Sequence, residues 1–159
     1  MKKASLFDII IATGFGAGFS PMAPGTAGAI VAVVIWWALS LALPFAWMVW
    51  LTALLIAVFT FLGIRAANAA ETVWGKDPSR VVVDEMVGVW IPMLAVPEGE
   101  AQWGFILASF ALFRLFDIWK PLGIRRMERF PGGVGVMMDD ILAGVYSLAI
   151  LIVARWWIG

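Results

Sequence analysis

The sequence predicts an all-α fold: a polytopic membrane bundle of about five transmembrane helices, preceded by an interfacial or re-entrant N-terminal segment. Two observations support this prediction. Of the 159 residues, 63% are hydrophobic and 14% are charged, whereas soluble domains average about 45–50% apolar and about 25% charged. The mean hydropathy is +0.96. A domain of this length already buries its core with ordinary composition, so the surplus must face lipid. We expect one domain, residues 1–159.

Five segments are candidates for crossing the bilayer, because a helix needs about 20 apolar residues to span a hydrocarbon core of roughly 30 Å. They are Gly25–Leu43, Phe45–Ile64, Val81–Val96, Ala101–Trp119 and Asp140–Ile158. The first two contain no charge and are separated by Pro44. The third is shorter and contains Pro92. Between the second and third, we expect a polar helix, Arg65–Gly75.

The segment before Gly25 is apolar but contains Asp8 together with several glycines and prolines. Lys2 and Lys3 precede a hydrophobic run, as in a signal peptide, but Asp8 interrupts that run. This argues against a signal peptide. We therefore predict that the segment lies at the membrane interface or re-enters the bilayer.

The distribution of Lys and Arg predicts the orientation, since short cytoplasmic loops collect basic residues. With five spans and the N-terminus inside, nine of the 11 basic residues are cytoplasmic: Lys2, Lys3, Arg65, Lys76, Arg80, Lys120, Arg125, Arg126 and Arg129. The outer loops contain Glu98 and Glu100 and no base. Tryptophans at the outer ends of the spans fit an interfacial belt: Trp47, Trp50, Trp103, Trp156 and Trp157.

The composition also restricts the chemistry. The chain has no cysteine and no histidine, which excludes disulfides, thiolate zinc sites, cysteine nucleophiles and the Ser-His-Asp triad. A net charge of zero gives no electrostatic reason to expect nucleic acid. Catalysis would have to rely on carboxylates, hydroxyls, Lys, Arg or a metal bound through oxygen.

Five carboxylates from three segments arrive at the predicted cytoplasmic end of the bundle: Asp84, Glu85, Asp117, Asp139 and Asp140. Charges at span ends are costly unless they are paired, solvated or bound to metal. Hard cations such as Mg²⁺ take oxygen ligands, so we predict that these five are catalytic residues and metal ligands. The alternative is an ordinary ion-pair network with the nearby bases Arg114, Lys120, Arg125, Arg126 and Arg129.

Two further patterns lie near these acids. Arg114, Asp117 and Lys120 recur every third residue and share a helix face, as in a phosphate-holding site or a simple salt-bridge ladder. The glycine-rich run from Gly14 to Gly25 can offer backbone amides to an anion, with Ser20 and Thr26 as hydroxyl donors. A flexible hinge or close helix packing is the alternative for this run. The turn Lys76-Asp77-Pro78-Ser79 is interpreted as structural.

Four motifs occur together in this order: Gly14-Phe15-Gly16-Ala17-Gly18-Phe19-Ser20-Pro21-Met22-Ala23-Pro24-Gly25-Thr26, Val83-Asp84-Glu85-Met86-Val87-Gly88, Phe113-Arg114-Leu115-Phe116-Asp117-Ile118-Trp119-Lys120-Pro121 and Gly132-Gly133-Val134-Gly135-Val136-Met137-Met138-Asp139-Asp140-Ile141-Leu142-Ala143-Gly144. They are spread over most of the chain, from Gly14 to Gly144, and together they resemble the phosphatidylglycerophosphatase A family. The resemblance implies a Mg²⁺-dependent phosphatase of the bacterial inner membrane, which converts phosphatidylglycerophosphate to phosphatidylglycerol and phosphate.

The chemistry expected from the residues agrees with this resemblance. The carboxylates would hold one or two Mg²⁺ ions, and the alternative for one of them, Glu85, is to act as general base instead of ligand. Arg114, Lys120, Ser20 and Thr26 would bind the phosphate. No Asp-x-Asp pair supports a phospho-aspartate intermediate. The alternatives are an ion-coupled transporter and a non-catalytic lipid-binding protein that use the same carboxylates.

Overall fold

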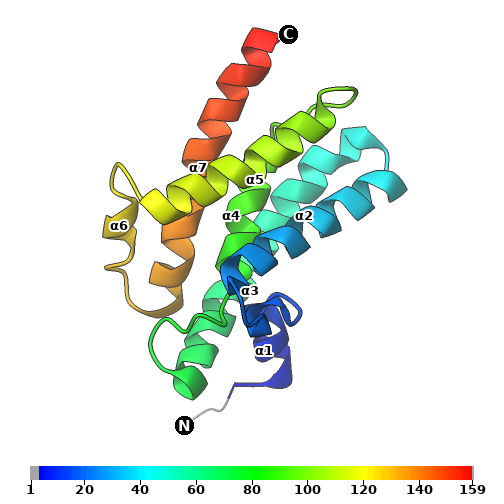
Figure 1. Cartoon of the computed structure of the whole chain (residues 1–159). Coiled ribbons are helices and arrows are strands. Elements are labelled where there is room, and N and C mark those ends of the chain that lie inside the picture. Colours follow the sequence, from blue (N-terminus) through cyan, green and yellow to red (C-terminus); the bar gives the residue numbers. More distant parts are fainter. Residues whose placement is uncertain (1–3, 159) are drawn as a thin grey trace.

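The computed structural model describes residues 4–158, and all the regular structure in this range is helical (Figure 1). The helices are α1 (Leu6–Ala12), the 3₁₀ helix η1 (Ala17–Phe19), α2 (Pro24–Ala42), α3 (Phe45–Trp74), α4 (Val83–Met93), α5 (Gln102–Trp119), α6 (Ile124–Met127) and α7 (Gly132–Ile158). The all-α prediction is confirmed. Lys2 and Lys3, which entered the predicted orientation, lie outside the described residues.

Three of the described helices are long and apolar enough to cross a membrane: α2, α3 and α7. They correspond to the first, second and last predicted spans, whereas the full set of five spans is not shown. The predicted polar helix Arg65–Gly75 is helical as far as Trp74, and it is the continuation of the second span, since α3 runs without a break for 30 residues. Its last turns continue because Ala66, Ala67 and Ala70 are buried in a cluster with Ile11 and Ala12 of the N-terminal segment.

The central helix is α4, which contacts α2, α3, α5 and α7 (Figure 1). It has 11 residues, and at about 1.5 Å per residue it is only about 16 Å long. Val81–Val96 therefore does not form one membrane-crossing helix, since the hydrocarbon core is roughly 30 Å thick. Every residue of α4 except Glu85 is buried, and Trp90 Nε1 donates a hydrogen bond to Ala32 O of α2 at 2.9 Å. Its apolar residues form the core of the bundle instead of facing lipid.

Two glycines allow α4 and α7 to approach closely. A Cβ on Gly144 would lie 2.5 Å from Gly88 O, and a Cβ on Gly88 would collide with the ring of Phe113. Gly88 lies one helical turn after Asp84, and Gly144 lies one turn after Asp140. Residues four apart share a helix face, so the contact between the glycines also draws the two carboxylates together.

The N-terminal segment is a short helix followed by a tight turn. Ser5 caps α1 by accepting a hydrogen bond from Asp8 N at 3.1 Å, and Asp8 pairs with Arg65 Nε at 3.4 Å. Large apolar side chains are exposed along this segment: Leu6, Phe7, Ile10, Phe15, Phe19 and Met22. With seven residues, α1 is too short to span the bilayer, and its exposed apolar side chains suit an interfacial position.

Candidate functional site

A cavity of about 530 Å³ opens at the end of the bundle where α3 and α5 end and where α2, α4 and α7 begin. All five predicted carboxylates line it, together with Arg114 and Lys120. The further lining residues are Ala23, Pro24, Gly25, Glu71, Lys76, Asp77, Pro78, Ser79, Val81, Glu128, Phe130, Gly132, Gly135 and Val136. The structure thus brings together side chains from separate parts of the chain, as the sequence predicted.

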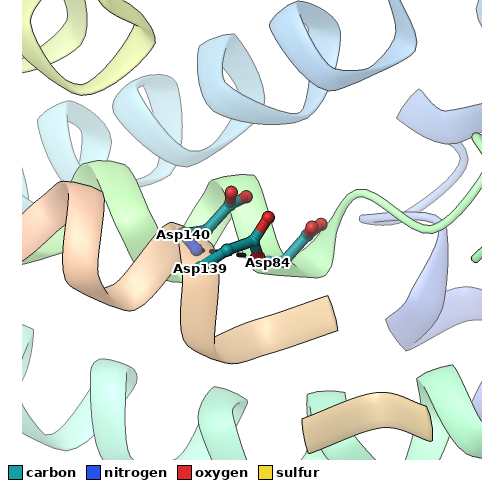
Figure 2. Close-up of side chains that lie close together, drawn as sticks. All are labelled: Asp84, Asp139 and Asp140. Atoms are coloured by element: carbon teal, nitrogen blue, oxygen red, sulfur yellow. Dashed lines mark hydrogen bonds between the residues drawn. The ribbon is translucent and has the colours of Figure 1, made fainter. Parts of the chain in front are cut away.

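The five carboxylates form two sets that have Asp140 in common. One set is Asp84, Asp139 and Asp140, and the other is Glu85, Asp117 and Asp140. Within each set, one oxygen of every residue lies within 4.8 Å of the others. Figure 2 shows the first set, in which Asp84 from α4 faces Asp139 and Asp140 from α7. The backbone N–H of Asp140 donates a hydrogen bond to Asp139 Oδ1 at 2.9 Å, which orients that carboxylate.

Three of these side chains each have one buried oxygen without a hydrogen-bond partner among residues 4–158. The atoms are Asp84 Oδ1, Glu85 Oε2 and Asp140 Oδ2. Asp84 is 8% exposed and Asp140 is 2% exposed. An unpaired buried polar group costs about 1–3 kcal/mol, and more when it is charged. Buried carboxylate oxygens without donors, in side chains that belong to these sets, fit a hard divalent cation such as Mg²⁺, which prefers oxygen ligands.

The other two carboxylates are paired with the predicted basic residues. Arg114 Nη1 lies 2.6 Å from Asp117 Oδ2. Lys120 Nζ lies 2.7 Å from Asp139 Oδ2, 3.1 Å from Glu128 Oε1 and 3.8 Å from Asp117 Oδ1. The salt-bridge ladder along α5 is therefore present, and Lys120 extends it to α7.

The charge of Lys120 is secured by these partners. Burial alone lowers the pKa of Lys120, but the hydrogen bond to Asp139, the charge of that carboxylate and the bond to Glu128 outweigh burial. The net result is a pKa above the usual value for lysine. The ammonium group therefore stays protonated at neutral pH and can act as a fixed positive charge beside the carboxylates.

The two predicted hydroxyl donors are not among the described residues that line the cavity. Ser20 Oγ instead donates to Met22 O at 2.8 Å, within its own turn, and Thr26 lies in the first turn of α2. The residue that reaches the site is Gly25, where a Cβ would lie 2.7 Å from Glu85 Oε1. The geometry therefore favours close packing for this glycine and gives no support to Ser20 and Thr26 as phosphate ligands.

Sequence reasoning missed a second group of polar residues on the cavity wall: Glu71, Lys76, Asp77, Ser79 and Glu128. The backbone N–H of Asp77 donates to Glu71 Oε1 at 3.2 Å. Burial and the charges of Glu128 and Glu71 raise the pKa of Asp77. The available signal was position, since the turn of Asp77 joins two segments at the predicted cytoplasmic end.

The start of α7 also differs from the prediction. The fifth span was expected to begin at Asp140, but the helix begins at Gly132, so Asp139 and Asp140 lie inside it. Asn68 of α3, which was not assigned a role, accepts a hydrogen bond from Gly133 N at 2.6 Å. A Cβ on Gly133 would collide with Ile64 O. Close packing on α3 thus fixes the first turn of α7 and, through it, the acidic pair.

The fold and the cavity together define a helical membrane protein with a carboxylate centre suited to a divalent cation. The family model described as phosphatidylglycerophosphatase A matches residues 10–155, and the chain belongs to that family. It is therefore a lipid phosphatase, a phosphoric monoester hydrolase that acts on a phospholipid. This membership decides against the transporter and the non-catalytic alternatives.

Three relatives refine the comparison. The chain is 63% identical over 159 residues, the full length of both proteins, to a Bacteroides thetaiotaomicron protein that bears the provisional name phosphatidylinositol-3-phosphatase. It is 38% identical over 144 residues to phosphatidylglycerophosphatase A of Escherichia coli, covering 89% of this chain and 80% of that protein. It is also 38% identical over 169 aligned positions to the Haemophilus influenzae phosphatidylglycerophosphatase A, covering 99% and 95% respectively. No solved structure matches the chain.

Proposed function

We propose that this chain is a Mg²⁺-dependent phosphatase that hydrolyses phosphatidylglycerophosphate to phosphatidylglycerol and inorganic phosphate. The family match over residues 10–155 and the two relatives of that name support this substrate. The observation that carries the chemistry is the convergence of two carboxylate sets, with three unpartnered buried oxygens, on one cavity. A phosphomonoester on a lipid headgroup lies at the membrane surface, which is where we place this end of the bundle.

The metal ligands in this proposal are Asp84, Glu85, Asp117, Asp139 and Asp140. A bound divalent cation supplies charge stabilisation of the phosphoryl group and lowers the pKa of a water molecule. Hydrolysis requires that the water oxygen bonds to phosphorus, that the ester bond to the glycerol oxygen breaks, and that the glycerol oxygen gains a proton. The protein residues must therefore orient the phosphate and move one proton.

Three side chains of the cavity suit these tasks. Arg114 and Lys120 can donate charge-assisted hydrogen bonds to phosphate oxygens, because Arg114 has donors beyond the one used by Asp117, and Lys120 has one beyond those used by Asp139 and Glu128. Glu85 is half-buried at the cavity wall and has an unpartnered oxygen. A carboxylate has two oxygens, so Glu85 can offer one to a cation and accept the proton of the attacking water with the other.

We propose that the cavity end faces the cytoplasm of a bacterial inner membrane, with the chain passing five times between the two ends of the bundle. Lys76, Arg80 and Lys120 at this end support the orientation. The third passage comprises α4 and the residues that follow it. Arg155 Nη1 near the end of α7 donates to Ala95 O at 3.4 Å, so these residues reach the opposite end.

Cysteine labelling tests this orientation, because the chain has no cysteine of its own. An impermeant maleimide applied to intact spheroplasts should label Glu100→Cys. It should not label Asp77→Cys until the membrane is permeabilised. Labelling of position 77 from outside would reverse the topology.

A second substrate, phosphatidylinositol 3-phosphate, is favoured by the name of the 63% identical relative. Its phosphate is attached to a secondary ring carbon, whereas the phosphate of phosphatidylglycerophosphate is on a primary alcohol. The decisive experiment measures phosphate release by the purified protein from mixed micelles of each lipid, with Mg²⁺ and with EDTA.

We expect Mg²⁺-dependent release with a kcat/KM at least about tenfold higher for phosphatidylglycerophosphate, a difference of about 1.4 kcal/mol in transition-state binding. A preference for the inositol lipid would replace our substrate. Release from neither lipid by folded protein would overturn the phosphatase proposal. Glu100→Gln, which changes a carboxylate far from the cavity, is the matched control.

A further inference from the structure

The arrangement of the carboxylates carries an inference about how many cations they hold. We infer that the centre binds two divalent cations, one in each carboxylate set, and that Asp140 is a ligand common to both. This inference rests on the proposed function, because the same residues form the proposed catalytic site. To the proposed function it adds the number of cations and the identity of the ligand that they share.

The two sets have the same make-up. Each contains Asp140, one carboxylate paired with a basic side chain and one that has an unpartnered oxygen. In the first set, Asp139 pairs with Lys120 and Asp84 Oδ1 is unpartnered. In the second set, Asp117 pairs with Arg114 and Glu85 Oε2 is unpartnered. A single cation would satisfy one set and leave the unpartnered oxygen of the other set buried.

Asp140 occupies the position that a shared ligand requires. It is 2% exposed and belongs to both sets, and its Oδ2 has no hydrogen-bond partner among residues 4–158. A carboxylate has two oxygens and about four lone-pair directions, so one side chain can serve two cations. Paired ions in phosphatases lie about 3.5–4 Å apart, a spacing that one carboxylate can bridge.

The charge of the cavity also favours two ions. Eight carboxylates and three basic side chains line it, which leaves an excess of five negative charges when all are ionised. Two like charges about 4 Å apart repel by about 4 kcal/mol at an effective dielectric constant near 20. One divalent cation would leave three negative charges facing a phosphomonoester of about −1.5 to −2. Two cations leave one negative charge, so the substrate phosphate meets much less repulsion.

The test uses Mn²⁺ as a spectroscopic substitute for Mg²⁺ on the purified full-length protein in detergent. We expect equilibrium dialysis to count two Mn²⁺ per chain, and electron paramagnetic resonance to show an exchange-coupled pair. Asp84→Asn and Glu85→Gln should each retain one Mn²⁺ with an uncoupled six-line spectrum. Asp140→Asn should weaken both sites by more than about tenfold and abolish the coupling. Glu100→Gln should bind two coupled ions as the wild type does.

One Mn²⁺ per wild-type chain without coupling would overturn the inference, and this result needs no variant to fold. Loss of all Mn²⁺ from both single-set variants, with unchanged circular dichroism, would also overturn it by showing that the five residues form one site. Phosphate release from the same samples separates the two proposals. Release with a single ion would retain the phosphatase and remove the pair, whereas two coupled ions without release from either lipid would retain the pair and remove the phosphatase.

Discussion

Two cavities lined by described residues are similar in size but opposite in character. The cavity at the carboxylate end has a volume of about 530 Å³ and is lined by 11 charged side chains. The second has a volume of about 440 Å³ and lies near the other end of α7. It is lined by Leu94, Ala95, Leu148, Ile152, Arg155 and Trp156, of which one is charged. Volume therefore does not distinguish the functional site from the second cavity. The charge of the lining residues and the helix contacts that position them do distinguish it.

The walls of the two cavities are held differently. At the carboxylate end, Gly88 and Gly144 bring two helices into backbone contact, and Gly25 brings a third against Glu85. These contacts force acids together although they repel each other. At the second cavity, Arg155 donates a hydrogen bond to the carbonyl of Ala95, just after the central helix α4. This bond has a structural role. The comparison predicts large effects of substitution at the first cavity and small ones at the second.

Asp140→Asn is expected to have the largest effect. The substitution keeps the size of the side chain but removes the charge that both carboxylate sets share. We expect kcat to fall by at least about 10³-fold, since metal-assisted stabilisation of the phosphoryl group is worth several kcal/mol. Phosphate release with saturating Mg²⁺ measures this. A loss of less than tenfold would show that Asp140 is structural.

Gly144→Ala should reduce activity by disturbing the contact between α4 and α7, because it removes no catalytic group. The added Cβ would lie 2.5 Å from Gly88 O, so α4 and α7 must separate. Overpacking of this kind costs about 1–3 kcal/mol, and a displacement near 1 Å can reduce turnover about 10²-fold. Thermal unfolding and phosphate release should both detect the change.

Gly104→Ala is the matched control for this substitution, since a Cβ at this position on α5 would meet no described atom within 4 Å. It should leave turnover within about twofold and raise helix stability by up to about 1 kcal/mol. Equal effects of the two glycine substitutions would mean that the close α4–α7 contact does not hold the site.

Lys120→Met should have an intermediate effect. It removes the ammonium group that pairs with Asp139 and Glu128 while keeping most of the aliphatic stem. Losing a charge-assisted hydrogen bond costs about 1.5–3 kcal/mol, so we expect kcat/KM to fall by about 10- to 100-fold. Lys120→Arg should recover part of this loss because it restores the charge. Equal activity of the Met and Arg variants would show that the charge of Lys120 has no part in turnover.

Arg155→Gln should have the smallest effect. It shows how much a substitution at the second cavity changes activity, for comparison with those at the carboxylate cavity. Its guanidinium lies at the second cavity and can be replaced by an amide donor to Ala95 O. We expect phosphate release within about twofold of the wild type and a change in stability of about 0.5 kcal/mol. A tenfold loss of activity would mean that the second cavity takes part in catalysis.

Local patterns allowed much of this to be predicted. Uncharged runs such as that of α2 predicted helices because the backbone must satisfy its own hydrogen bonds in lipid. Asp84, Asp117 and Asp139 were predicted to meet because each lies at the same end of a span. The sequence did not predict that the second span and the polar helix form one continuous α3, and it predicted α4 as longer than it is. Alanines that pack on α1 extend α3, whereas burial on all sides makes α4 apolar without making it long.

The sequence by itself determined the helical class, the scarcity of charge and the restriction to oxygen ligands, because these follow from composition and from the order of polar and apolar residues. Only the tertiary structure decided which acids share a set, that Asp140 belongs to both, and that Glu71 and Asp77 join the wall while Ser20 does not. Such choices depend on distances between segments remote in the chain. Those distances are set by contacts of helix backbones at glycines such as Gly88 and Gly144.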